Sequence, residues 1–319
     1  MDVALLGLGK SGQALLEELI HNEFVDTIYV FDPNPLPLTS WTIESSKKVQ
    51  VFQDVFSILH PFDLVVIASP DHLHYVDLMQ CIQFGIPTFV EKPYVSSRTE
   101  LDRITDELKR NPQYQTTCNL VLRSSPLFRQ VRSEFLKGAF GSQVFIEGKY
   151  LYGRWNKVMN GWRGHENYSV ILGGLIHLVD LACFLTGNFD YEVSIKTQRI
   201  TSKEPKYITD FAQVSMSSSA TGFCSLTTDF SANVDHRRDI SIFGDLANLE
   251  VRGEEVDSSP ELLGRFDGLS PAPESKRALL SGFISKLNGV DSSDNTTPNI
   301  EEILKVLNIC LGKASYNID

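Results

Sequence analysis

A glycine-rich turn near the start of the chain has the spacing of a dinucleotide-binding motif. The segment Gly7-Leu8-Gly9-Lys10-Ser11-Gly12 follows the apolar run Val3–Leu6 and opens a predicted helix that ends at about His21. In such a unit the first glycine permits a tight turn, the second lets the backbone approach a pyrophosphate, and the third lets helix and strand pack closely. The helix N-terminus adds unpaired N–H groups and a positive dipole. The turn therefore predicts a pyrophosphate site formed by Gly7, Gly9, Lys10, Ser11 and Gly12.

An acidic residue stands where this motif needs one. Asp32 follows a second predicted strand, Thr27–Phe31, and lies 20 residues after Gly12. A carboxylate at this place accepts hydrogen bonds from the adenosine ribose hydroxyls and repels a 2′-phosphate. The next residues, Pro33-Asn34-Pro35, include no basic side chain to hold such a phosphate. The sequence therefore favours NAD over NADP. The alternative, that the glycines only shape a strand–helix turn, is the weaker interpretation once the strand, the helix and Asp32 are taken together.

Two further turns are expected at the carboxyl ends of parallel strands, where the ligands of such sheets bind. Ser69, Pro70 and His74 follow the run Leu64–Ala68 and are candidates for cofactor contact, although His74 fits a packing role equally well. Glu91 and Lys92 follow the strand Pro87–Val90. The proline after Lys92 keeps the lysine backbone extended. A lysine beside a cationic nicotinamide and partly out of water is suited to take a proton from a hydroxyl; the alternative is a solvated surface lysine.

The elements that must position these residues fall into two groups. In the first third, short apolar runs alternate with helical patterns, which is typical of a Rossmann-like, doubly wound parallel sheet in an α/β fold. Later strand patterns are joined by short turns and indicate a C-terminal α+β domain with a large, mostly antiparallel open sheet. We expect domains at 1–118 and 119–319, a last helix at about 300–314 that packs back on the first domain, and loops from Arg252 to about Pro273.

The composition narrows the class of protein. The 319 residues suit two domains, and 42% hydrophobic with 22% charged residues is ordinary for a folded soluble protein. A net charge of −11 disfavours nucleic acid or an anionic membrane as the main partner. The five cysteines form no CxxC pair or Cys/His cluster, so we expect no metal site and buried thiols in a reducing, cytoplasmic setting. No signal peptide or membrane span is visible in the sequence.

Several motifs together resemble the Gfo/Idh/MocA oxidoreductase family, which includes glucose–fructose oxidoreductase and inositol dehydrogenase. The resemblance rests on GLGKSG, ASPDHLHY, FGIPTFVEKP and RSSPLFRQVRSEFLKGAFG, continues through GWR and GGLIHLVD, and covers nearly the whole chain. It implies a Rossmann domain followed by an α/β domain whose open sheet often builds a dimer or tetramer. It also implies that Lys92 carries the chemistry.

The resemblance gives roles to residues of the second half as well. His177 matches a histidine that lines the substrate site and assists proton transfer; the alternative is a core histidine paired to Asp180, three residues later on the same helix face. Trp162 and Arg163 match a pair near the nicotinamide, and Trp162 fits the core equally well. Arg123 is a candidate for binding an anionic part of the substrate, with a role at a helix end or domain contact equally open.

One position departs from the family pattern. Many active members carry an Asp four residues before the histidine, and this chain has Gly173 there. Either Lys92 and His177 suffice, or Tyr168 or Asp180 substitutes, or catalysis was lost. We expect an NAD-dependent dehydrogenase that acts on a secondary alcohol of a sugar, cyclitol or sugar derivative, assembled as a homodimer or homotetramer. The alternatives are a non-catalytic NAD-binding sensor and an NAD-dependent glycosidase.

Overall fold

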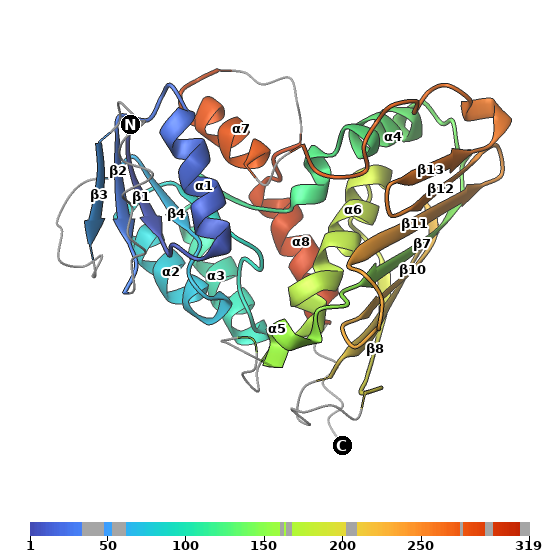
Figure 1. Ribbon diagram of the computed structural model, residues 1–319, viewed down its shortest axis with the longest axis horizontal. Helices are drawn as coiled ribbons and strands as arrows, with labels where there is room; N and C mark the ends of the chain where they lie inside the picture. The colour runs from blue at the N-terminus through green and yellow to red at the C-terminus, as the bar shows by residue number, and fades with distance from the viewer. Residues whose placement is uncertain are drawn as a thin grey trace. The chain divides into compact units, whose positions relative to one another are not determined.

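The computed structural model describes residues 1–33, 48–52, 62–159, 163, 168–201, 209–274, 277–290 and 296–312. The chain divides into two compact units (Figure 1). The first comprises Met1–Val121 and Ser275–Ile303, and the second comprises Leu122–Glu274 and Leu304–Asp319. Each unit is built on a sheet of its own.

The first unit contains a six-stranded sheet in the order β3-β2-β1-β4-β5-β6, and every neighbouring pair is parallel. This is the strand order of a doubly wound dinucleotide-binding fold, as predicted. The strands are β1 (Asp2–Leu6), β2 (Thr27–Phe31), β3 (Lys48–Phe52), β4 (Leu64–Ile67), β5 (Thr88–Val90) and β6 (Thr116–Cys118). The helices are α1 (Lys10–His21), α2 (His74–Phe84), α3 (Arg98–Arg110), α7 (Ala278–Leu287) and α8 (Ile300–Leu311), the last of which is divided between the two units.

Local sequence signals explain most of these elements. All four residues of β4 are buried, as expected for a central parallel strand with both faces covered. Helix α3 begins with a capping box, in which Ser97 and Glu100 satisfy each other's backbone N–H groups. Helix α7 was not predicted. Its residues Leu280, Phe283 and Ile284 join the core of the first sheet and α1, although they come from the far end of the chain.

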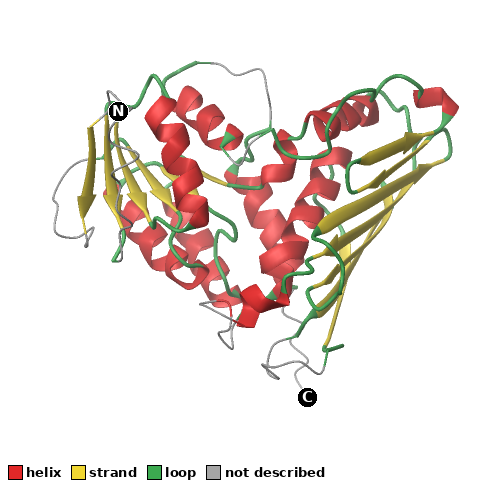
Figure 2. Cartoon of the chain, in the orientation of Figure 1, coloured by secondary structure: helices red, strands yellow, loops and turns green. Residues whose placement is uncertain are grey.

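The second unit contains a seven-stranded sheet in the order β13-β12-β11-β7-β10-β9-β8. Only the β7–β10 pair is parallel, so the prediction of a mostly antiparallel sheet is confirmed. Figure 2 shows the strands with helices packed on one face. The strands are β7 (Val144–Leu151), β8 (Glu192–Gln198), β9 (Phe211–Ser218), β10 (Gly222–Asp229), β11 (Arg237–Gly244), β12 (Asn248–Arg252) and β13 (Glu255–Ser258). The helices are α4 (Pro126–Leu136), α5 (Trp155–Met159) and α6 (Ile176–Thr186).

Strand β13 corrects one prediction, because it lies inside the segment expected to be loop. Gly253 has a φ of +63° and turns the chain between β12 and β13. The strand is polar, and it forms one end of the sheet in the observed strand order. It therefore lacks the apolar alternation by which the other strands of the second sheet were recognised.

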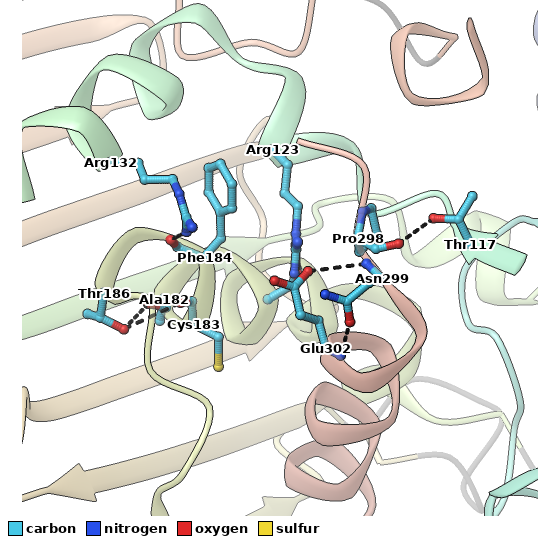
Figure 3. A network of polar contacts seen from close by, with 11 residues as sticks. Thr117, Arg123, Arg132, Ala182, Cys183, Phe184, Thr186, Pro298, Asn299 and Glu302 are labelled. Carbon is cyan, nitrogen blue, oxygen red and sulfur yellow. Dashed lines mark hydrogen bonds and ion pairs between the residues drawn. The ribbon is translucent and has the colours of Figure 1, made fainter. Parts of the chain in front are cut away.

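Polar and cation–aromatic contacts join neighbouring elements within each unit (Figure 3). In the second unit, the Arg132 side chain of α4 donates to the Phe184 carbonyl of α6, and its guanidinium lies 4.3 Å from the Phe184 ring centroid. In the first unit, the Thr117 hydroxyl donates to the Pro298 carbonyl over 2.8 Å. Asn299 and Glu302 cap the start of α8 by exchanging backbone-to-side-chain hydrogen bonds.

All five cysteines are buried thiols. Burial raises the pKa of each thiol for which a shift is resolved, namely Cys81, Cys183, Cys224 and Cys310. They are therefore packing residues, which agrees with the expectation from their scattered positions. Within the described ranges, no helix combines the length and the apolar character that crossing a membrane requires.

Candidate functional site

The glycine turn has a local geometry that only glycine provides at two of its positions. Gly7 has a φ of +93°, and a Cβ placed on it would lie 2.6 Å from the Ala68 carbonyl oxygen. A Cβ on Gly12 would collide with the Gly7 carbonyl. Gly9 is different, because a Cβ there would have nothing within 4 Å. The turn is thus compressed at its two ends and open in the middle, where a pyrophosphate needs access to the backbone.

The start of α1 suits an anion. Gly9 is the N-cap of this helix, no side chain caps it, and its first turn contains Lys10 and Ser11 but no acidic residue. The N–H groups of a first helical turn have no intrahelical acceptor, so they remain for a bound group. Together with the helix dipole, they can hold the pyrophosphate of a dinucleotide. The residues present therefore fit NAD at this place.

Asp32 lies beside the turn. Its carboxylate Oδ2 accepts a hydrogen bond from the Leu8 N–H over 2.6 Å, and its own N–H donates to the Phe52 carbonyl at the end of β3. The residue thus stands at the carboxyl end of β2, next to the turn that follows β1. A carboxylate here suits the hydroxyls of an adenosine ribose.

The other predicted cofactor residues of the first unit follow the next two strands. Ser69 comes after β4, where its hydroxyl donates to Asp77 Oδ2 over 2.8 Å, and Pro70 begins the single 3₁₀ turn that leads into α2. Glu91 comes after β5, and its Oε1 accepts from Asn119 Nδ2 over 2.6 Å. Lys92 is the next residue and is half-buried. Because β2, β1, β4 and β5 are neighbours in the sheet, the fold brings these residues to one edge.

His74 requires a correction. Its side chain has no exposed surface, and both ring nitrogens face backbone carbonyls of the protein. A side chain engaged in this way cannot also contact a cofactor. We therefore replace the expected cofactor contact of His74 with a structural role.

In the second unit, His177 is the second residue of α6. This helix follows directly on a π-helical turn formed by Ile171–Leu175. Such turns are rare and often occur at functional sites. The imidazole is 8% exposed, and its ring stacks on Tyr150 of β7 with centroids 6.2 Å apart. The Tyr150 hydroxyl lies 3.1 Å from Nε2 of His236, which precedes β11. Tyr150 and His236 were not predicted, because no local motif marks them.

The Tyr150–His236 pair is neutral near pH 7. Burial, followed by the positive charges of Arg238 and Arg154, lowers the pKa of His236 to about 4. Burial raises the pKa of Tyr150, while Arg238, Arg154 and Arg163 oppose that rise. Arg163 therefore acts electrostatically on the same cluster. Trp162, its predicted companion, lies outside the described residues.

Gly173 and Tyr168 occupy the same small volume. A Cβ at position 173 would collide with the Tyr168 hydroxyl and lie 2.7 Å from its ring carbon Cζ. The Tyr168 ring in turn packs at a tilt on Phe230, with centroids 6.2 Å apart. Where the family pattern places an Asp side chain, this chain thus places a tyrosine hydroxyl. Of the substitutes considered from the sequence, Tyr168 has this geometry.

Arg123 and Asp180 form a buried ion pair. Arg123 Nε lies 3.0 Å from both carboxylate oxygens of Asp180, and a terminal nitrogen lies 2.6 Å from Oδ1. The Arg123 side chain has no exposed surface and that of Asp180 only 1%. Substrate contacts by these two side chains are therefore replaced by a structural role as a buried ion pair, which was not among the alternatives given for Arg123. Within the described parts of the chain, no group of three or more His, Cys, Asp or Glu residues could hold a metal ion.

Comparisons with known proteins agree with this geometry. Residues 1–117 match the family model described as an oxidoreductase family with an NAD-binding Rossmann fold. The chain is 21% identical over 204 residues to inositol 2-dehydrogenase of Rubrobacter xylanophilus, a match that covers 63% of this chain and 57% of that protein. The chain spans about half the length of the curated relatives it matches.

Two solved structures share the fold across both units. The WlbA dehydrogenase from Bordetella pertussis, in complex with NADH and UDP-GlcNAcA, has a TM-score of 0.78 at 16% identity and covers 96% of this chain and 92% of its own. The myo-inositol 2-dehydrogenase from Lactobacillus plantarum has a TM-score of 0.78 at 14% identity, with 97% and 95% covered.

The fold and the glycine turn define an NAD-binding Rossmann protein with a second α+β unit. Within this class, residues 1–117 match the Gfo/Idh/MocA family of NAD-binding oxidoreductases, and the chain is similar to inositol 2-dehydrogenases.

Proposed function

We propose that this protein is an NAD-dependent dehydrogenase that interconverts a secondary alcohol and a ketone of a sugar, cyclitol or sugar derivative. The observation that carries the proposal is the set of residues at the carboxyl ends of the strands of the first sheet. There the open glycine turn, Asp32 and the half-buried Lys92 follow neighbouring strands. The names of the relatives support the substrate class, since they include an inositol dehydrogenase and a dehydrogenase solved with NADH and a nucleotide sugar.

Each residue then has a defined task. The N–H groups of the turn at 7–12 bind the pyrophosphate, and Asp32 accepts from the adenosine ribose. NAD⁺, when bound, supplies the hydride acceptor for the carbinol carbon. Lys92 Nζ removes the proton of the substrate hydroxyl in the oxidation and returns it in the reduction. His177 donates a hydrogen bond to the substrate and passes the proton on.

We further propose that Tyr168 supplies the polar group that position 173 lacks. Its hydroxyl lies where a side chain on Gly173 would project, near the start of the helix that carries His177. Asp180 is held against Arg123 in the core and is not suited to this task. A phenolic hydroxyl can donate and accept a hydrogen bond, so it can orient a sugar hydroxyl without carrying a charge.

The cofactor, the domain roles and the localisation are proposed as follows. Asp32 repels a 2′-phosphate, so we propose NAD as the cofactor rather than NADP. We propose 1–118 as the cofactor domain and 119–319 as the substrate and oligomerisation domain. The buried thiols suit a cytoplasmic protein.

We also propose assembly as a homodimer or homotetramer through the open face of the second sheet. Phe145, Phe223 and Phe243 lie side by side there on β7, β10 and β11, with 36–41% of their surfaces exposed. Their rings stack, with centroids 5.9 and 6.1 Å apart. Phe145 and Phe223 also border a hollow of about 1680 Å³. A row of exposed aromatic rings is unusual on the surface of a monomer.

A panel of sugars and cyclitols tests the activity. Purified protein is mixed with NAD⁺ and each compound, and the near-ultraviolet absorbance band of NADH is followed, while calorimetry measures NAD binding. Turnover of at least one polyol is the expected result. Tight NAD binding without turnover of any compound would contradict the proposal. It would favour a non-catalytic sensor, the second candidate that the glycine at position 173 suggests.

A further inference from the structure

The His74 side chain bridges two backbone carbonyls inside the first unit. Nδ1 lies 2.7 Å from the Pro93 carbonyl oxygen, and Nε2 lies 2.8 Å from the Ser69 carbonyl oxygen. A carbonyl oxygen can only accept, so both bonds form together only when both ring nitrogens carry a proton. The geometry therefore calls for a doubly protonated, cationic ring, although the side chain is completely buried.

The surroundings of the ring suit a positive charge. Asp77 lies one turn further along α2. Burial raises the pKa of its carboxyl, while the hydrogen bond from Ser69 and then the positive charge of His74 oppose that rise. A negative Asp77 would stabilise the buried cation electrostatically. The two carbonyls add charge-assisted hydrogen bonds, which are shorter and stronger than neutral ones.

The two carbonyls belong to the turns after β4 and β5, which carry the proposed cofactor and acid–base residues. Ser69 begins the turn after β4, and Pro93 directly follows Lys92. On the other side of Lys92, Glu91 is fixed twice, since its N–H donates to the Ile67 carbonyl over 2.8 Å and its carboxylate accepts from Asn119. The backbone at Lys92 is therefore held from both neighbouring residues, by β4 and Asn119 before it and by His74 after it.

We propose that His74 is a positioning residue for Lys92, and that its cationic ring ties the carbonyl of Pro93, the residue after Lys92, to the turn at Ser69. The inference rests on the proposed role of Lys92 as the acid–base. A displacement of a catalytic group by about 1 Å can cost on the order of 10²-fold in rate. This buried side chain joins the two turns and is thus placed to control catalysis without touching the substrate.

Two substitutions separate the shape of the ring from its hydrogen bonds. His74→Phe keeps a planar ring without donors, and His74→Gln keeps one donor nitrogen, which replaces one of the two bonds. His72→Phe is the matched control, because His72 is an exposed histidine two residues earlier. We expect His74→Phe to lower kcat by about 10²-fold, with KM and the Kd for NAD within a few-fold of the original. The kcat of His74→Gln should lie between those of His74→Phe and the original protein. His72→Phe should leave kcat unchanged.

Two spectroscopic readouts do not depend on turnover. In ¹⁵N-histidine-labelled protein, the resonances of His74 should show both ring nitrogens protonated at neutral pH. In protein methylated with ¹³C at its lysines, the Lys92 resonance, assigned with a Lys92→Arg variant, should shift in His74→Phe and His74→Gln but not in His72→Phe. Should no polyol be turned over, the proposed function fails while these signals still decide the inference. The inference would be overturned by a neutral His74 ring, or by a Lys92 resonance that does not shift in His74→Gln.

Discussion

The N–H of Leu8 donates to Asp32 Oδ2 over 2.6 Å, which ties the acid at the end of β2 to the glycine turn after β1. Hydrogen bonds to a charged acceptor are short and strong, so this bond fixes the orientation of the carboxylate. One carboxylate oxygen therefore serves the protein, while we propose that the carboxylate also accepts from a ribose hydroxyl. The first prediction separates these two tasks, one in the turn and one toward the cofactor.

Asp32→Asn should narrow the preference for NAD over NADP without unfolding the turn. The amide oxygen can still accept from Leu8, but the charge that repels a 2′-phosphate is gone. Hydrogen bonds to charged groups contribute about 1.5–3 kcal/mol, so the ratio of the two affinities should fall on the order of tenfold or more. Titration calorimetry with both cofactors measures this ratio. Tighter binding of NADP by the unmodified protein would show that Asp32 does not select NAD.

Gly173→Ala should destabilise the protein because of the Tyr168 hydroxyl. The added methyl group has no room beside this hydroxyl, and overpacking of this kind typically costs about 1–3 kcal/mol. In a Tyr168→Ala background the same substitution should cost much less. Urea unfolding of the original protein, the two single variants and the double variant gives the coupling energy between the two positions directly. If the two substitutions were additive, Tyr168 would not occupy the space that position 173 leaves open.

His236 should titrate near pH 4 rather than near the value of 6.5 that an unperturbed histidine has. The folded state then binds this proton more weakly than the unfolded state does. As the pH falls from about 6.5 toward 4, the unfolded state is protonated first, and stability is lost across that window. An NMR titration of the histidine ring protons measures the midpoint, with a His236→Gln variant for assignment. A midpoint above 6 would mean that the ring is not held neutral beside Tyr150.

Phe145→Lys should weaken the proposed oligomer. Phe145 is the central ring of the exposed row, so a charge there lies between Phe223 and Phe243. Lys109→Ala, at an exposed position of α3 in the first unit, serves as the control. Light scattering at micromolar concentration should give a multiple of the chain mass for the original protein and the control, and a lower mass for the variant. A monomeric original protein would exclude this assembly.

The fold was largely predictable because its sheets bury apolar residues in regular patterns. Strand β4 is a continuous apolar run, and β7 alternates buried and exposed positions, so both were recognised. Strand β3 and helix α7 were missed. The first is a short strand that alternates polar and apolar residues, and the second lies among turn-forming residues and joins a core from the other end of the chain.

The candidate site was predictable only where the chemistry is local. The glycine turn, Asp32 and Lys92 stand next to the strands that position them. The contact of His177 with Tyr150 is different, because it arises when a helix packs on a strand that precedes it in the chain. Position along the chain also suggested substrate contacts for Arg123 and Asp180. It carried no information about their mutual burial, which leaves them to stabilise the second unit.

The measurement that tests the central claim most directly compares Lys92→Met with the original protein under single-turnover conditions, using the best polyol of the panel and saturating NAD⁺. The proposed pyrophosphate and ribose contacts lie at 7–12 and Asp32, so the affinity for NAD should stay within a few-fold. A general acid–base group typically contributes about 10²–10⁴-fold, and we predict a loss of hydride-transfer rate of that order. An unchanged rate with unchanged NAD affinity would contradict the assignment of Lys92 as the group that moves the substrate proton.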